Sequence, residues 1–144
     1  MKIKKIFPLF LFILIFQSCS TMSSFTSIPP GAKVEIGKAQ VIGTTPFSGK
    51  ISNTTFGTYP VKVQKDGYET IYSNLPLKVR GRNIALSAIF FAPAAFFSVQ
   101  NALPFYEFDL EKSVIRYKIK RNSEWLIYET PDNQKDAVRS FFED

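Results

Sequence analysis

Polar and apolar residues alternate in several short stretches of this chain, which is the pattern of half-buried β-strands. The clearest stretches are residues 33–36, where Val34 and Ile36 alternate with charged residues, and residues 59–64. Residues 25–28 show the same pattern further upstream. Turn residues separate these stretches at intervals of about 8–12 residues, with no helical periodicity between them. The pattern therefore predicts a mainly β fold, a small antiparallel β-sandwich.

The alternation resumes in the C-terminal third of the chain. Residues 105–110 and 115–120 predict two strands, joined by a turn at Glu111-Lys112-Ser113. We expect this hairpin to complete the sandwich begun upstream. Its first strand is acidic and its second is basic, so cross-strand pairs such as Glu107 with Lys118 would favour one register.

A strand at residues 125–128 and a short helix are predicted for the end of the chain. Thr130 is the expected N-cap, Pro131 the first helical residue, and Asp132 complements the positive end of the helix dipole. The helix would run to about Phe142, with one apolar face that packs on the core rather than on a partner. The residues of that face are Ala137, Val138, Phe141 and Phe142.

An uninterrupted apolar run at residues 6–16 breaks the strand pattern at the start of the chain. Three lysines precede it, and it is too short to cross a bilayer comfortably. A polar exit follows, Gln17-Ser18-Cys19-Ser20, and Cys19 is the single cysteine of the sequence. This arrangement is typical of a signal peptide.

These residues resemble a bacterial lipoprotein precursor, in which a small residue precedes a cysteine that becomes the lipidated N-terminus. Ser18 and Cys19 match that pattern, while Phe16 and Gln17 differ from the usual leucine and small residue. The resemblance implies a lipoprotein signal peptide at 1–18 and acyl chains on Cys19 in the bacterial cell envelope. Ser20 would favour sorting to the outer membrane. A tether at 19–26 would follow; the alternative is a secreted protein cut near residues 18–23, with a free thiol.

A second apolar stretch, residues 83–106, contains 24 residues without a charge. Arg80 and Arg82 precede it, and Phe105 and Tyr106 at its end are candidate interfacial aromatic residues. Pro93 interrupts it, so that its strongly apolar part is shorter than a bilayer requires. Three alternatives follow: a membrane span, insertion at the membrane surface or as a hairpin, or burial against the β-domain or a partner.

Four turn motifs occur in order between the predicted strands, and together they resemble the PEGA family. They are Pro29-Pro30-Gly31-Ala32, Gly43-Thr44-Thr45-Pro46, Gly57-Thr58-Tyr59 and Lys65-Asp66-Gly67-Tyr68. Pro30 stands where the family has glutamate, and Thr58 separates Gly57 from Tyr59. The resemblance implies a small extracytoplasmic β-sandwich, often lipid-anchored, that is not an enzyme and has no single known ligand.

This PEGA-like β-domain is predicted at 27–74, and the C-terminal hairpin and helix at 107–144. Gly31, Gly43 and Gly67 are expected in turns. The residues expected in the core are Val34, Ile36, Val41, Tyr59, Val61, Val63 and Tyr68.

The composition excludes most classes of catalytic mechanism. The chain has no histidine and one cysteine, which excludes a histidine-based triad, a Cys/His metal site and an intramolecular disulfide. It has no phosphate-binding loop motif either, so we predict no enzyme, cofactor or metal; a carboxylate-only hydrolase is a weaker third hypothesis. Without Lys2, Lys4 and Lys5 the 18 basic residues become 15 against 12 acidic ones, a net charge of +3 that does not favour nucleic acid.

The sequence thus predicts a lipid-anchored cell-envelope binding or structural module. Its partners would be the membrane, through the lipid on Cys19, and another envelope protein or a polysaccharide. The alternative is a membrane-integrated accessory subunit of an envelope complex that uses residues 83–106.

Overall fold

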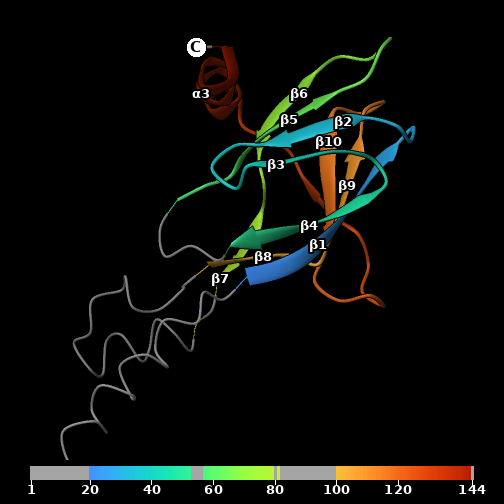
Figure 1. Ribbon diagram of the computed structural model, residues 1–144, viewed down its shortest axis with the longest axis vertical. Coiled ribbons are helices and arrows are strands. Elements are labelled where there is room, and N and C mark those ends of the chain that lie inside the picture. The colour runs from blue at the N-terminus through green and yellow to red at the C-terminus, as the bar shows by residue number, and fades with distance from the viewer. Residues whose placement is uncertain (1–19, 53–56, 80, 82–99, 144) are drawn as a thin grey trace, which may run out of the picture.

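Two β-sheets packed against each other carry the fold (Figure 1). The computed structural model describes residues 20–52, 57–79, 81 and 100–143. Within these residues the chain is mainly β, with a short helix near the C-terminus. This confirms the predicted small β-sandwich.

The first sheet joins the two halves of the chain. Its strand order is β11-β10-β9-β1-β4, and all neighbours are antiparallel except β1 and β9, which run parallel. The C-terminal hairpin β9–β10 therefore completes the sandwich, as predicted, by pairing with the first strand of the PEGA-like region. The strands are β1 (Ser20–Ile28), β4 (Phe47–Ser52), β9 (Phe105–Asp109), β10 (Val114–Lys118) and β11 (Leu126–Tyr128).

The second sheet is wholly antiparallel, with the order β3-β2-β5-β6. A short ribbon of two further strands, β7 and β8, lies beside β1 and β4. The bounds are β2 (Lys33–Ile36), β3 (Val41–Thr44), β5 (Pro60–Gln64), β6 (Ile71–Asn74), β7 (Leu77–Val79) and β8 (Gln100–Ala102).

Stacked aromatic rings and branched aliphatic side chains fill the space between the sheets. The ring of Phe25 lies 5.4 Å from that of Tyr106 and 6.2 Å from that of Phe108, in nearly parallel planes. The predicted alternation explains this core, because every second residue of these strands faces inward. Val34, Ile36, Val61 and Val63 are fully buried, Tyr59 nearly so, and Val41 packs against them. Tyr68 was predicted in the core but is 38% exposed, because it follows the turn after β5.

The first described residues differ from the predicted tether at 19–26. Strand β1 begins at Ser20, so residues 20–26 lie in the first sheet. Small hydroxyl residues suit this position because Ser23 is fully buried and donates a hydrogen bond to the carbonyl of Leu103 at 2.7 Å. A serine-rich composition had indicated flexibility, but here the hydroxyl satisfies a buried carbonyl group.

The β9–β10 hairpin turns at residues 110–113, close to the predicted turn, but its charge pairing differs from the prediction. Register places Arg116, not Lys118, opposite Glu107, and their side chains form an ion pair at 3.1 Å. Lys118 lies instead over the ring of Trp125, with its Nζ 4.6 Å from the ring centroid.

Helix α3 (Asp132–Glu143) follows β11 and packs against β5 and β6 (Figure 1). The carbonyl of Pro131 accepts the hydrogen bond of Lys135, so Pro131 precedes the helix rather than beginning it. The predicted N-cap, Thr130, uses its hydroxyl to hydrogen-bond Ser73 instead. Of the predicted apolar face only Val138 is buried, while Phe141 lies over Gly37 with about half of its surface exposed.

Only part of the predicted apolar stretch at 83–106 lies among the described residues. Gln100 opens β8, which pairs with β7 beside the sandwich, and Tyr106, a candidate interfacial residue under the membrane-span alternative, is a buried core residue of β9. The remainder, 83–99, lies outside the described residues. No helix in the described part of the chain is long and apolar enough to cross a bilayer.

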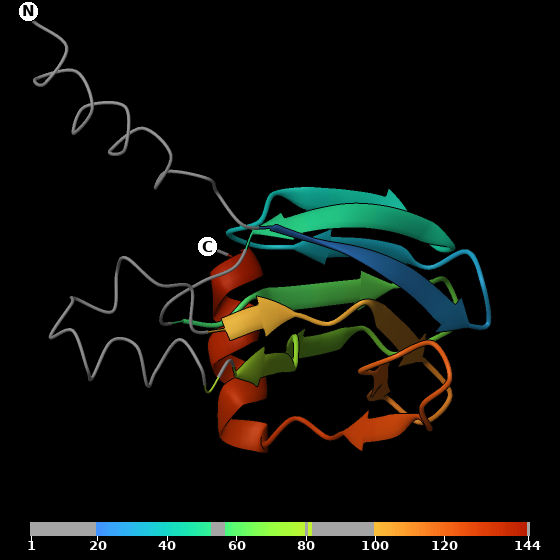
Figure 2. The same cartoon turned by 90° about the horizontal axis from the view of Figure 1, so that it is seen from below.

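The sandwich has two ends that differ in the chain connections they carry (Figures 1 and 2). We call one end the base, formed by Ser20, Ser52, Val79 and Gln100, which begin or end strands β1, β4, β7 and β8. The opposite end, called the turn end, carries the connections at residues 29–32, 45–46 and 65–68. Three of the four PEGA-like motifs thus converge at the end furthest from the start of β1.

Candidate binding groove at the turn end

A single buried threonine joins the first two motif turns. The Oγ1 atom of Thr45 accepts hydrogen bonds from the backbone N–H groups of Gly31 at 3.2 Å and Ala32 at 3.0 Å. The backbones also pair, with Gly31 donating to the Thr45 carbonyl and Thr45 donating to that of Ala32. These bonds hold the Pro30-Gly31 turn against the β3–β4 turn.

The hydrogen bonds extend from Thr45 to the end of β1. Ser27 donates its hydroxyl proton to the carbonyl of Pro29 at 2.7 Å. Because a hydroxyl has one proton to donate, the contact between Ser27 Oγ and Thr45 Oγ1 is donated by Thr45. Both hydroxyl groups are therefore satisfied inside the protein, and this cluster is structural.

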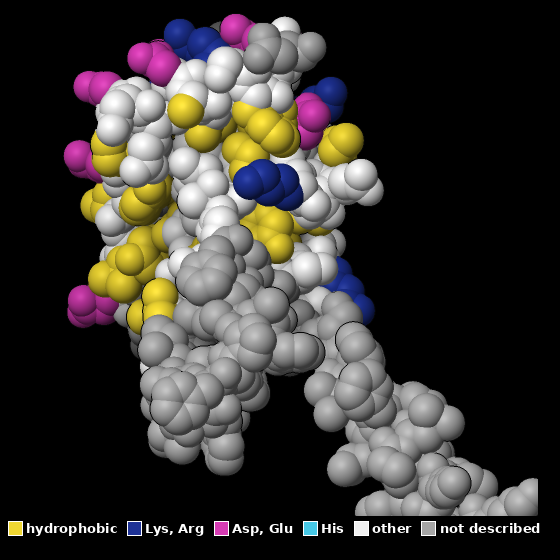
Figure 3. Space-filling model, turned by 90° about the vertical axis from the view of Figure 1, so that its left-hand side faces the viewer, with side chains coloured by type: hydrophobic (Ala, Val, Ile, Leu, Met, Phe, Trp, Pro, Cys, Tyr) yellow, Lys and Arg dark blue, Asp and Glu magenta, His cyan; other side chains and the backbone are white. Residues whose placement is uncertain are grey.

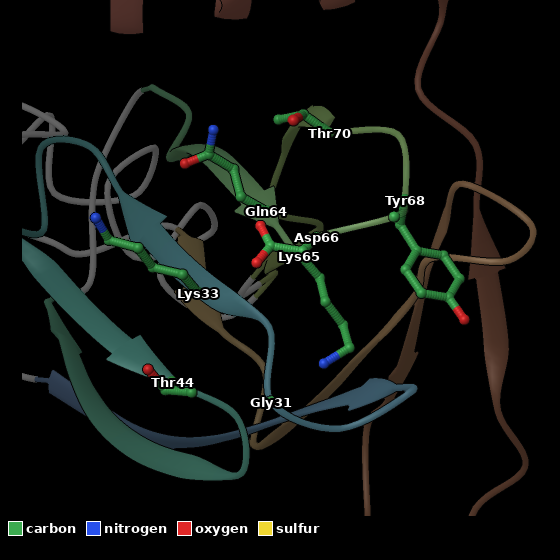
Figure 4. A pocket seen from close by; sticks show the side chains of 9 residues that line it. Gly31, Lys33, Thr44, Gln64, Lys65, Asp66, Tyr68 and Thr70 are labelled. Atoms are coloured by element: carbon green, nitrogen blue, oxygen red, sulfur yellow. The ribbon is translucent and has the colours of Figure 1, made fainter.

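An open polar groove of about 640 Å³ lies beside this cluster (Figure 4). Gly31 adopts a φ of +88°, which favours glycine, and a Cβ at this position would lie only 3.3 Å from the Nζ of Lys65. Gly67, with a φ of +84°, completes the predicted Asp66-Gly67 turn, in which Tyr68 donates to the Lys65 carbonyl. The lining residues are Gly31, Lys33, Thr44, Gln64, Lys65, Asp66, Gly67, Tyr68 and Thr70.

The chemistry of the groove suits a polar ligand. Lys33 and Lys65 supply two cations against the one carboxylate of Asp66, and within the described residues none of the three forms an ion pair. Gln64, Thr44 and Thr70 add amide and hydroxyl groups, and the ring of Tyr68 stands at one side (Figure 4). Such a set can form hydrogen bonds and charge contacts, but it contains no nucleophile–base pair. No group of three or more metal-ligating side chains occurs among residues 20–52, 57–79, 81 and 100–143.

The structure brings together some of the residues that the sequence singled out. Gly31 and Gly67 line the groove. Gly43 was predicted in a turn but lies in β3, where the ring of Phe47 occupies the space that a Cβ would need. Cys19, the predicted lipidation site, lies outside the described residues, directly before β1.

Sequence reasoning did not identify the polar side chains that complete the groove. Lys33 begins β2, whereas Gln64 ends β5 and Thr70 lies in the connection that follows it. Each lies within a few residues of a motif turn. Closeness to these turns in the sequence could therefore have identified them.

The sheets and the paired turns define the class of this protein: a small β-sandwich whose motif turns are linked at one end. Residues 22–90 match the family model of the PEGA domain, so the chain contains a PEGA-like domain. The match ends before β8, and strands β8–β11 and helix α3 lie beyond it. No curated protein and no solved structure matches the chain.

Proposed function

We propose that this protein is a lipid-anchored binding or structural module of the bacterial cell envelope, without catalytic activity. Cys19 is the lipidation site, and the outer membrane is the proposed location. The observation that carries the proposal is the position of the first strand: β1 starts at Ser20, directly after the cysteine of the lipobox-like sequence. A protein cut just before Cys19 would keep the whole strand intact.

The turn end is the proposed binding surface. The groove lined by Gly31, Lys65 and Tyr68 lies at the turn end, opposite the start of β1, so a lipid on Cys19 would leave it open to solvent. Its hydroxyl, amide and ammonium groups suit a polysaccharide of the envelope or a polar surface of another envelope protein.

Cell fractionation tests the anchoring. Wild-type protein should incorporate labelled fatty acid and remain in the membrane fraction, whereas Cys19→Ala should incorporate none. The matched control is Ser23→Ala, which leaves the cysteine in place and should still be labelled. Labelling of Cys19→Ala, or a wild-type protein without label, would overturn the proposal.

A second candidate is the membrane-integrated accessory subunit that uses residues 83–106. One observation restricts this candidate to insertion from one side of the membrane: Val79 pairs with Gln100 across β7 and β8. Two paired residues must lie on the same side of a bilayer, so the chain between them would have to enter and leave the membrane on one side. A single crossing by this stretch is incompatible with that pairing, and residues 100–106 are needed in the sandwich.

Alkaline extraction distinguishes the two candidates. For this test residues 1–18 are replaced by a secretory signal peptide that is cleaved without a cysteine, so that Cys19→Ala keeps no apolar leader. Under the lipid-anchor proposal this variant is released from washed membranes at high pH, and its retention in the extracted membranes would favour the integrated subunit instead.

A further inference from the structure

We propose that the base of the sandwich is a membrane-contacting surface, which seats the domain on the headgroups and directs the groove away from the bilayer. This inference rests on the proposed lipidation of Cys19. It adds an orientation and a second set of membrane contacts, made by described side chains of β1, β4 and β7.

The chain between the lipidated Cys19 and the first strand is too short for the sandwich to move far from the bilayer. Strand β1 begins one residue after Cys19, and a fully extended residue spans at most about 3.6 Å. The headgroup layer on each side of a bilayer is about 5–8 Å thick. The base therefore cannot move clear of the headgroups while acyl chains on Cys19 are inserted. A tether of several residues, as the sequence had suggested, would have allowed any orientation.

The side chains near the base have the composition of an interfacial surface. Met22 is 64% exposed and Val79 is 53% exposed, so each leaves much of an apolar side chain in solvent. Lys50 lies opposite Met22 in the β1–β4 register, and Lys78 precedes Val79 in β7; both are exposed. Apolar side chains beside lysines suit the boundary between acyl chains and anionic headgroups.

Figure 3 views the described domain from one side. Its hydrophobic side chains lie there in several separate groups among acidic, basic and uncharged polar side chains, rather than in one continuous apolar patch.

The connectivity of the chain also favours the base as the end that contacts the membrane. Val79 and Gln100 are neighbours, so the stretch between them departs from and returns to the base. By sequence, residues 83–99 contain no charged residue. The two most apolar parts of the precursor sequence thus both connect to the described fold at the base, whereas the turn end presents the polar groove.

Depth-dependent fluorescence quenching tests the orientation in the full lipidated chain. Single cysteines, Met22→Cys or Val79→Cys at the base and Asp66→Cys at the turn end, are labelled with bimane, because acylation blocks Cys19. The proteins are reconstituted in vesicles of phosphatidylethanolamine and phosphatidylglycerol that contain doxyl-labelled phospholipid. Labels at the base should lose roughly half of their fluorescence, while the label at Asp66→Cys should lose almost none.

Mass spectrometry of the same samples separates the two possible failures. Lipidated protein with equal quenching at both ends, or with none at Met22→Cys and Val79→Cys, overturns the orientation and leaves the proposed anchor intact. Protein without lipid on Cys19 overturns the proposed function and this inference with it. Two base positions are used so that one misfolded variant cannot decide the result.

Discussion

The hydroxyl of Thr45 accepts a hydrogen bond from the backbone N–H of Ala32 at 3.0 Å, so one buried side chain joins two of the PEGA-like turns. Residues 32 and 45 are separated by two strands, yet their backbones also pair through a bond from Thr45 to Ala32 at 2.9 Å. The shape of the groove beside Gly31 depends on this contact.

Thr45→Val should destabilise the protein by about 1–3 kcal/mol, because it leaves the buried N–H of Ala32 without its partner while it keeps the side-chain volume. The free energy of unfolding can be measured by urea denaturation in mild detergent, followed by the fluorescence of Trp125, the single tryptophan. Thr44→Val is the control, since Thr44 is exposed and should change stability by less than about 0.5 kcal/mol. Equal effects of the two substitutions would contradict the role of Thr45.

Tyr106 should make stability decrease at alkaline pH. Burial raises the pKa of its hydroxyl well above the ordinary value near 10, and the hydroxyl donates to the Pro76 carbonyl at 2.8 Å. The unfolded chain therefore releases this proton before the folded chain does. The resulting stabilisation is complete below pH 10 and is lost as the pH rises further, by about 1.4 kcal/mol per pH unit.

The measurement is the slope of unfolding free energy against pH above 10, compared with Tyr106→Phe. The variant should be less stable at neutral pH but should have the shallower slope. Tyr68→Phe, at a residue that is 38% exposed, is the control for the loss of a tyrosine hydroxyl outside the core. Identical slopes for Tyr106→Phe and the unsubstituted protein would show that Tyr106 does not cause the loss of stability at alkaline pH.

The pairing of Glu107 with Arg116 can be tested by double-mutant cycles. The two side chains are mostly buried, and Arg116 also lies 3.8 Å from the carboxylate of Asp109. Glu107→Gln combined with Arg116→Met should show a coupling energy of about 0.5–1 kcal/mol that weakens with added salt. Glu107→Gln combined with Lys118→Met should show almost none. A larger coupling energy for Glu107 with Lys118 than for Glu107 with Arg116 would instead support the pairing predicted from the sequence.

Gly37 should be intolerant of a side chain because the ring of Phe141 lies over it. A Cβ at residue 37 would come within 2.3 Å of that ring, so Gly37→Ala should weaken the docking of α3 at a cost of about 1–3 kcal/mol. Hydrogen exchange of the α3 amides reports the effect directly. In a Phe141→Ala background the added cost of Gly37→Ala should fall, and an unchanged cost would show that the ring is not responsible.

Alternation and turn chemistry were sufficient to predict the sandwich. The strands around Val34 and Val61, the Asp66-Gly67 turn and the β9–β10 hairpin follow from local periodicity, which each segment carries by itself. The parallel pairing of β1 with β9 could not be predicted in this way, since it joins residues about 80 positions apart. Serines in β1 indicated a tether because their burial against Leu103 is a property of that distant pairing.

The candidate groove was predictable only in part. Gly31 and Gly67 identify the turns because those backbone angles favour glycine. Lys33, Gln64 and Thr70 were not identified, since a polar residue on an exposed strand face gives no sign of which other polar residues lie beside it.

The most direct test of the proposed lipid anchor is the intact mass of the purified protein, followed by sequencing of its N-terminal peptide. Lipidation of Cys19 predicts a chain that begins at Cys19 and is heavier than the polypeptide by a diacylglyceryl group, with or without a further acyl chain. A chain that begins at another residue, or an unmodified Cys19, would contradict the proposed anchor and the orientation that depends on it.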